Sequence, residues 1–351
     1  MTIYYVTIFV FLMLGHFYDR LASEDINNDK TKIIYIAIVV FSLIYGFRFE
    51  VGVDWFNYIT SYNMHIDDGE KIYEFTTLEI GYKLLNIIAY YVDQGIVTVI
   101  FLSTVLFISF TLFALKNIGL NPFYFFAIVA PYHFVMSGVN YTRQSVALSI
   151  FLYAVSFLIN KDKNRFLLFI VIAGTFHTSA LCFAPLFFIE NKKRYLTIIL
   201  LIVIPPIVFS MLGEYEQYLQ GSMDSAGLYL RALYLIAPSF LLILHYKTVK
   251  EFSLIEKRLI YLVFFSFPLI VLFSVLSTTI ADRFAYYFIL LNTLCWMLVS
   301  KRDENVKSQY LKPYGNLILF SSSLLAFIVW TLYTRYISSY EFDSYFNYWL
   351  S

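Results

Sequence analysis

Apolar runs of roughly 17 to 24 residues recur along this 351-residue chain from one end to the other. A helix of about 20 residues rises about 30 Å, which is the thickness of the hydrocarbon core of a bilayer. Helices satisfy their backbone hydrogen bonds internally, so they can cross lipid repeatedly. We therefore expect an all-α polytopic membrane protein with about 10 to 11 transmembrane helices, organised as a single integral membrane domain over residues 1–351.

The composition agrees with this class and excludes others. Hydrophobic residues make up 60% of the chain, charged residues 14%, and the formal net charge is +1. No basic stripe or tail could neutralise a phosphate backbone, so we expect no nucleic-acid partner. Cys182 and Cys295 lie within apolar runs, and the five histidines form no pair at ligand spacing. We therefore expect no disulfide framework, no metal site and no cofactor.

The positions of lysine and arginine orient the predicted helices. The positive-inside rule assigns 18 of the 25 basic residues to cytoplasmic loops and leaves seven on the outer side. Residues 48–95 then form a long external loop. Within it, residues 79–94 place polar and apolar side chains on opposite stripes, and Glu79 and Lys83 are spaced as an i,i+4 pair. We expect an amphipathic helix lying at the outer membrane surface rather than a span.

Residues 166–189 form a long apolar run with basic residues near both ends. A simple span cannot have both ends in the cytoplasm, so we expect a bent or re-entrant hairpin with Gly174 and His177 near its tip. Such a hairpin is tolerated only where protein or a wet cavity satisfies the freed backbone groups. The alternative is a plain span that departs from the charge rule.

Arginine is concentrated on the outer side: five of the seven external cations are arginines, whereas 13 of the 18 cytoplasmic ones are lysines. A planar guanidinium binds phosphate oxygens through two parallel hydrogen bonds and keeps its charge in a low dielectric. Arg48, Arg143 and Arg283 end separate helices on this side, so they are candidates for a shared diphosphate-binding site. The structural alternatives are snorkelling for Arg231 and Arg335, helix capping by Arg143, and neutralisation of Arg283 by the preceding Asp282.

The segment from Arg48 to Tyr58, RFEVGVDWFNY, carries two carboxylates around a flexible glycine. A carboxylate beside a phosphate site could act as a general base toward a sugar hydroxyl. We expect Asp54 in that catalytic role, with His177 and Glu50 as the other candidates. The candidate substrate-binding residues are those close to the external charges, Tyr58, Gln144, Asp282 and Tyr286. The alternatives are interfacial anchoring for the tyrosines and packing for His177.

Five short motifs follow one another along the chain: Arg48, Gly52, Asp54 and Tyr58; Glu79-x-Gly81-Tyr82; Arg143-Gln144 followed by Ala147; Phe176-His177-x-Ser179-Ala180; and Arg283 with Tyr286 and Tyr287. In this order they resemble the EpsG/Wzy-type polysaccharide polymerases of bacterial inner membranes, and the resemblance covers nearly the whole chain. Each motif is short, and the specificity lies in their order. Glu50 departs from the first motif and leaves open which carboxylate acts.

The resemblance implies polymerisation of undecaprenyl-diphosphate-linked oligosaccharide repeat units into O-antigen or into capsular or exopolysaccharide. It implies a GT-C-like helical fold and metal-independent, inverting glycosyl transfer. It also implies a multi-pass protein of the bacterial inner (cytoplasmic) membrane whose active site faces the periplasm. The lipid-linked oligosaccharides would be donor and acceptor in the lipid bilayer, and a chain-length regulator would be a further partner.

Three other functions remain open. An O-antigen ligase-like enzyme shares the donor and differs in the acceptor. A transporter or flippase for lipid-linked glycans would carry charges along a path through the membrane, whereas the predicted spans are nearly free of ionisable residues. A membrane acyltransferase would need a histidine with a hydroxyl or carboxylate partner inside the membrane, and His177 is the one candidate.

Overall fold

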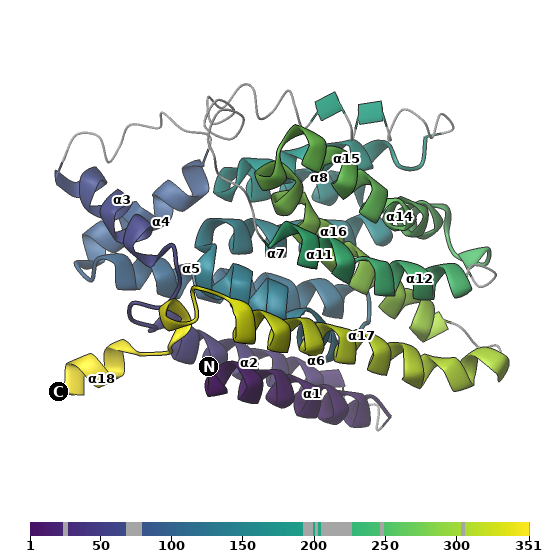
Figure 1. Ribbon diagram of the computed structural model, residues 1–351, viewed down its shortest axis with the longest axis horizontal. Helices are drawn as coiled ribbons and strands as arrows, with labels where there is room; N and C mark the ends of the chain where they lie inside the picture. The colour runs from purple at the N-terminus through teal and green to yellow at the C-terminus, as the bar shows by residue number, and fades with distance from the viewer. Residues whose placement is uncertain are drawn as a thin grey trace. The chain divides into compact units, whose positions relative to one another are not determined.

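The computed structural model describes residues 1–23, 27–67, 79–191, 199–200, 203–204, 227–245, 249–302 and 306–350. Within these residues the chain is almost entirely helical (Figure 1). The β contact in this part of the chain is an isolated antiparallel bridge between Arg48 and Ser344. The expectation of an all-α protein is confirmed.

Several described helices are long and apolar enough to cross a membrane. These six are Thr2–Leu21, Ile96–Asn117, Pro122–Asn140, Thr142–Ile159, Thr278–Arg302 and Tyr314–Tyr333. Leu254–Phe264 and Ser266–Val275, which meet at a bend of 49°, would make a seventh span if they act as one. The chain is therefore a multi-pass membrane protein. The larger expected number, about 10 to 11, includes segments outside the described residues and stays a prediction.

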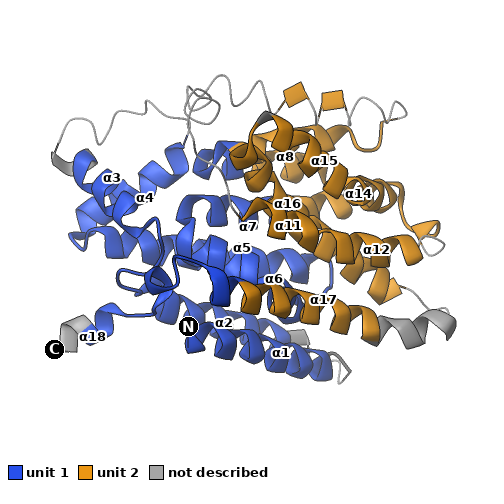
Figure 2. Ribbon diagram, in the orientation of Figure 1, with its two compact units in different colours: residues 1–153, 171–178, 330–351 blue, residues 154–170, 179–329 orange. Residues whose placement is uncertain are grey.

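The chain divides into two compact units, which Figure 2 shows in different colours. Unit 1 comprises Met1–Tyr153, Val171–Thr178 and Trp330–Ser351, and unit 2 comprises Ala154–Ile170 and Ser179–Val329. Three of the described α-helices contain residues of both units: α7 (Thr142–Ile159), α8 (Lys163–Phe176) and α17 (Val306–Tyr333). The single integral membrane domain stays a prediction.

The N-terminal helices of unit 1 are α1 (Thr2–Ser23), α2 (Asn27–Gly46), α3 (Trp55–Asp67), α4 (Ile80–Val92), α5 (Ile96–Asn117) and α6 (Pro122–Val129). α2 packs along α5, and α1 packs along α6. Asn121 is the N-cap of α6, and Pro122 suits its first helical position. The Asn121 amide also donates to the Gly15 carbonyl of α1 at 2.7 Å. One side chain thus starts a helix and attaches it to its neighbour.

α6 continues as a π-helix, η2 (Ala130–Asn140), which is buried along its whole length. π-helical turns are rare and occur frequently at functional sites. One residue, Tyr141, separates η2 from α7. The last carbonyls of a helix have no partner within it, so the end of η2 offers acceptor oxygens to other groups.

α4 is amphipathic, as expected, and its polar stripe faces the protein. Lys83 and Asn86 are buried, whereas Ile80, Leu84 and Ile88 are exposed. An exposed apolar stripe suits contact with lipid. The position of this helix at the outer membrane surface stays a prediction.

Residues 166–189 do not form one continuous α-helix. α8 ends at Phe176, and after His177 the chain continues as a 3-10 helix, η3 (Thr178–Phe188). Lys163 and Glu190, at the two ends of this segment, form an ion pair of 2.7 Å. The segment therefore turns back on itself, and its re-entrant insertion into a membrane stays a prediction.

Unit 2 contains α11 (Leu228–Tyr234), α12 (Ile236–Leu244), α14 (Leu254–Phe264), α15 (Ser266–Leu276) and α16 (Thr278–Arg302). α16 is buried over most of its length, and the other four helices pack against it. Asn292 of α16 donates to Ser266 of α15 and accepts from Ser239 of α12, at 3.0 Å each. A paired carboxamide thus joins three helices in an apolar interior.

Candidate functional site

Arg48 lies two residues after the end of α2, and only 1% of its surface is exposed. One terminal nitrogen donates to the Tyr45 carbonyl at 2.8 Å and to the Thr104 hydroxyl at 3.2 Å. The other donates to the Gly138 carbonyl at 3.4 Å and to the Thr142 hydroxyl at 3.3 Å. The two carbonyls belong to the C-terminal turns of α2 and η2, so Arg48 lies where two helices end.

All four acceptors of Arg48 are neutral, and no carboxylate pairs with it among the residues that the structure describes. Removing an ion from water costs several kcal/mol, which these bonds and the negative ends of two helix dipoles offset in part. Burial lowers the pKa of Arg48 to about 10, so the side chain is charged at neutral pH. Its Nε is buried without a hydrogen-bond partner in the described part of the chain.

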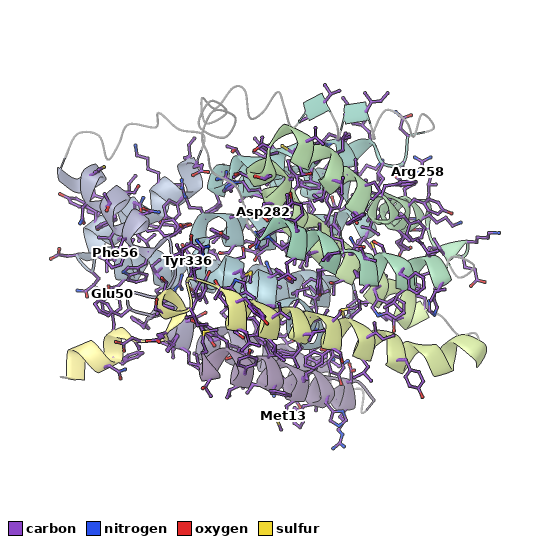
Figure 3. The ribbon with its side chains drawn as sticks, viewed as in Figure 1. Met13, Glu50, Phe56, Arg258, Asp282 and Tyr336 are labelled. Carbon is purple, nitrogen blue, oxygen red and sulfur yellow. The ribbon has the colours of Figure 1, made fainter. Side chains whose placement is uncertain are left out.

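The sequence of the segment that follows α2 explains its conformation. Gly52 has a φ of +110°, and a Cβ there would lie 3.0 Å from the Val139 carbonyl oxygen, so the position requires glycine. The side chain of Asn140 accepts from the Asp54 N–H at 3.0 Å, which attaches the segment to the end of η2. Asp54 is partly buried, whereas Glu50, which Figure 3 labels, is exposed.

Arg143, in the first turn of α7, has a side chain that is 45% exposed and pairs with Glu79 at 2.5 Å. Its guanidinium lies over the rings of Tyr58 and Tyr82, at 5.9 and 5.7 Å from their centroids. These are cation–π distances. One carboxylate and two rings therefore hold this arginine in place while part of it stays accessible.

Tyr58 and Tyr82 connect the two arginines. The hydroxyls of both tyrosines interact electrostatically with Arg48 and Arg143, and that of Tyr58 also interacts with Asp54. Burial raises the pKa of Tyr58, so its hydroxyl is protonated at neutral pH and is a hydrogen-bond donor. The buried Tyr82 hydroxyl has no hydrogen-bond partner in the described residues, a state that native proteins usually complete with water or a ligand.

His177 and Gln144 are both buried in unit 1. A Cβ at Gly81 of α4 would lie 2.5 Å from Thr175 Oγ1 and 2.9 Å from the Phe176 ring. The missing side chain at Gly81 therefore lets the residues just before His177 approach α4. The roles expected for His177 as a base and for Gln144 as a substrate ligand stay predictions.

In unit 2, Asp282 (labelled in Figure 3) and Tyr286 lie one turn apart on α16 and contact Arg231 of α11. Arg231 Nε donates to the Asp282 carboxylate, and a terminal nitrogen donates to the Tyr286 hydroxyl at 3.2 Å. All three side chains are buried. The assignment of Arg231 to snorkelling is therefore wrong, because its charge is neutralised inside the protein.

The structure thus brings together Arg48, Asp54, Tyr58 and Arg143 in unit 1, and Asp282 and Tyr286 in unit 2. Arg283 belongs to unit 2, so a diphosphate site built from all three arginines stays a prediction. Glu79, Tyr82 and Arg231 are the contacting residues to which the sequence assigned no role in the chemistry. Across the described ranges, no group of three or more His, Cys, Asp or Glu residues could hold a metal ion.

Comparison with protein-family models matches residues 31–348 to the EpsG family. No curated protein and no solved structure matches the chain. The matched range contains all five motifs, from Arg48 to Tyr287, so the resemblance is confirmed. Because the match covers nearly all of the 351 residues, this multi-pass membrane protein belongs to the EpsG family.

Proposed function

We propose that the protein is a glycosyltransferase that polymerises repeat units carried on undecaprenyl diphosphate, at the periplasmic face of the bacterial inner membrane. Membership of the EpsG family supports the polymerase class. The observation that carries the proposal is the arginine pair of unit 1. Arg48 is buried without an acidic partner in the described chain, and Arg143 is accessible between two tyrosines.

A diphosphate supplies the negative charge that this arrangement lacks. Arg143 binds its oxygens directly, because part of the guanidinium is exposed while Glu79 and the two rings fix its position. Arg48 is buried in the protein, so it acts on the diphosphate through its electrostatic field and not by direct contact. Two opposite unit charges about 8 Å apart, at an effective dielectric of about 20, attract each other by roughly 2 kcal/mol. This field favours the transition state over the ground state, because the diphosphate gains charge as it departs.

In the proposed reaction, an acceptor sugar hydroxyl attacks the anomeric carbon of the donor with inversion. The bond between that carbon and the diphosphate oxygen breaks, and the diphosphate leaves with the electron pair. Asp54, partly exposed next to Tyr58, accepts the proton of the attacking hydroxyl. The Tyr82 hydroxyl donates a hydrogen bond to a sugar or phosphate oxygen, which satisfies its buried donor.

The roles proposed for the residues of unit 2 rest on the order of the five sequence motifs. Arg283 binds diphosphate, and Asp282 and Tyr286 bind substrate. Arg231 fixes these last two by its ion pair and hydrogen bond, so it is a positioning residue.

The test uses the purified full-length protein in lipid, supplied with undecaprenyl-diphosphate-linked repeat units. Arg143→Lys is expected to lower the rate of polymer formation at least about tenfold, because a point charge cannot reproduce two parallel hydrogen bonds. The matched control is Arg165→Lys, at an exposed arginine whose partner is the nearby Asp162, and it should leave the rate unchanged. A wild-type rate from Arg143→Lys, at equal protein level, would remove this arginine from the mechanism.

The glycan profile of a cell that lacks the protein separates the polymerase from the nearest alternatives. Loss of long chains with one capped repeat unit retained indicates a polymerase. Loss of all capping indicates an O-antigen ligase-like enzyme. Accumulation of lipid-linked units at the cytoplasmic face indicates a flippase.

A further inference from the structure

The C-terminal part of unit 1 lies against the segment that carries Arg48 and Asp54. After α17 the chain passes through a short 3-10 turn, η4 (Ser338–Tyr340), and reaches α18 (Tyr345–Leu350) (Figure 1). Within residues 339–347, contacts with residues 47–52 are made by Ser339, Asp343, Ser344, Tyr345 and Phe346. Nothing in the mechanism above uses these contacts.

Four hydrogen bonds join the two segments. The segment after α2 donates two of them, from the Phe49 N–H to the Asp343 carbonyl at 3.0 Å and from the Gly52 N–H to the Ser339 carbonyl at 2.7 Å. The C-terminal segment donates the other two to the Phe47 carbonyl, from the Tyr345 N–H at 2.8 Å and from the Ser344 hydroxyl at 3.0 Å. Three of these bonds run between backbone groups, and Arg48 pairs with Ser344 as an antiparallel bridge. The C-terminal segment thus satisfies backbone groups on either side of Arg48.

Aromatic rings reinforce the same contact. Tyr345 packs on Phe49 with ring centroids 4.8 Å apart, and Phe346 packs on Phe47 at 5.0 Å. The C-terminal segment is itself anchored, because Phe342 packs on Tyr45 of α2 at 5.5 Å. The rings add apolar packing to the hydrogen bonds, since a two-stranded contact is marginally stable on its own.

The segment after Arg48 needs such support. It has no regular secondary structure between α2 and α3, and two of its residues have positive φ, Glu50 at 53° and Gly52 at 110°. A non-glycine residue in that region is uncommon and persists only where its surroundings determine the conformation. Asn140 fixes the segment on the side of η2, and the C-terminal residues fix it by the bonds described above.

We propose that residues 339–347 are a positioning element of the site, whose backbone holds residues 47–54 in the conformation that buries Arg48 and presents Asp54. This rests on the proposed function for its effect on rate. The C-terminal residues are assigned no contact with substrate. They act through the segment they hold.

Tyr345→Pro tests the contact with little disturbance of α18, because Tyr345 is the first residue of that helix, where proline is tolerated. The change removes the N–H that donates to the Phe47 carbonyl. Tyr345→Ala, the matched control, removes the ring and keeps the N–H. Misplacement of a catalytic group by about 1 Å can cost about 100-fold in rate, so we expect at least about a tenfold larger loss of polymer formation from the proline variant.

A second readout does not depend on activity. Val53 is exposed within the held segment, and both native cysteines are buried, so a spin label on Val53→Cys reports this segment selectively. The full-length protein in lipid is expected to show a more mobile label with Tyr345→Pro than with Tyr345→Ala, at equal melting temperature. Where the proline variant does not fold, Ser344→Ala removes the hydroxyl that donates to the Phe47 carbonyl and accepts from the Phe346 N–H, and it should shift both readouts in the same direction.

An unchanged label mobility would overturn the proposal, and so would a mobile label together with an unchanged rate. Increased mobility with a lowered rate supports it. Absence of polymer from the wild-type protein would count against the proposed function alone, because the mobility of the label still decides whether the C-terminal residues hold the segment.

Discussion

Arg48 has two features that a helix cap does not explain. A cap needs donors for the free carbonyls of α2 and η2, and two terminal nitrogens supply them. A neutral donor could do the same without the cost of burying a charge. The protein instead buries a full charge without a carboxylate partner in its described part, and leaves Nε without a hydrogen bond. The charge at this position therefore supports the proposal that Arg48 acts on an anionic ligand.

The first prediction separates the two carboxylates of the segment. Asp54→Asn keeps size and hydrogen bonding and removes basicity, and a lost general base costs about 10²- to 10⁴-fold in rate. Glu50→Gln should cost far less, because the Glu50 side chain is exposed at the surface. The measurement is polymer formed by each purified variant from lipid-linked repeat units. An inactive Glu50 variant beside an active Asp54 variant would reverse the assignment. If both variants were active, the general base would be His177, or the reaction would proceed without a dedicated base.

The second prediction uses the Tyr82 hydroxyl. A buried hydroxyl without a partner costs roughly 1 to 3 kcal/mol, so Tyr82→Phe should leave the substrate-free protein as stable as the wild type or more stable. The same change should lower the rate of polymer formation, because the donor to substrate is lost. Thermal unfolding and rate are measured on one preparation. A loss of stability in Tyr82→Phe would show that the hydroxyl already has a hydrogen-bond partner in the substrate-free protein. A wild-type rate of polymer formation would show that the hydroxyl does not contact substrate.

The sequence identified most of the charged residues of the site but not how they pair. Glu79 and Arg143 are 64 residues apart, and Arg231 and Asp282 are 51 apart. No local spacing relates such residues, because the fold alone brings them together. Arg231 resembles an interfacial arginine for the same reason: its burial depends on α16, which follows much later in the chain.

At the scale of elements, apolar runs predicted helices well because burial of backbone groups in lipid leaves few alternatives. α4 was predicted from its two stripes, but periodicity does not say which stripe meets the protein. Lys83 and Asn86 turned out to face inward. The π-helix η2 could not be predicted either, since its geometry depends on packing around it and its sequence has an ordinary apolar composition.

The third prediction concerns how α4 packs. Gly81→Ala would place a Cβ 2.5 Å from Thr175 Oγ1, and overpacking of this kind costs about 1 to 3 kcal/mol. We expect a lower melting temperature for Gly81→Ala and partial recovery when Thr175→Ala is added, because the second change removes the clashing atom. The single Thr175→Ala variant is the control. If the decreases in melting temperature were additive in the double variant, Gly81 and Thr175 would not be in packing contact.

At the scale of the whole molecule, the family match and the apolar helices establish a multi-pass membrane protein, whereas its orientation is a prediction from the charge pattern. The orientation depends on α4. With 13 residues, α4 rises about 20 Å, which is short of the hydrocarbon thickness of about 30 Å. α5, with 22 residues, rises about 33 Å and is long enough to cross. If α4 is not a span, Arg48 and Arg143 both belong to the outer side.

The last prediction tests this orientation directly. A reporter inserted after Gln94, between α4 and α5, should report the outer side, and one inserted after Lys116, at the end of α5, should report the cytoplasm. Both insertions are made in the full-length chain, and polymer formation is checked so that only folded proteins are scored. If α4 were a span, the two results would exchange, and Arg143, which follows α4 in the chain, would face the cytoplasm, where a periplasmic polymerase cannot use it. If both reporters gave the same side, α5 would not cross, and the outer assignment of the segment carrying Arg48 would lose its basis.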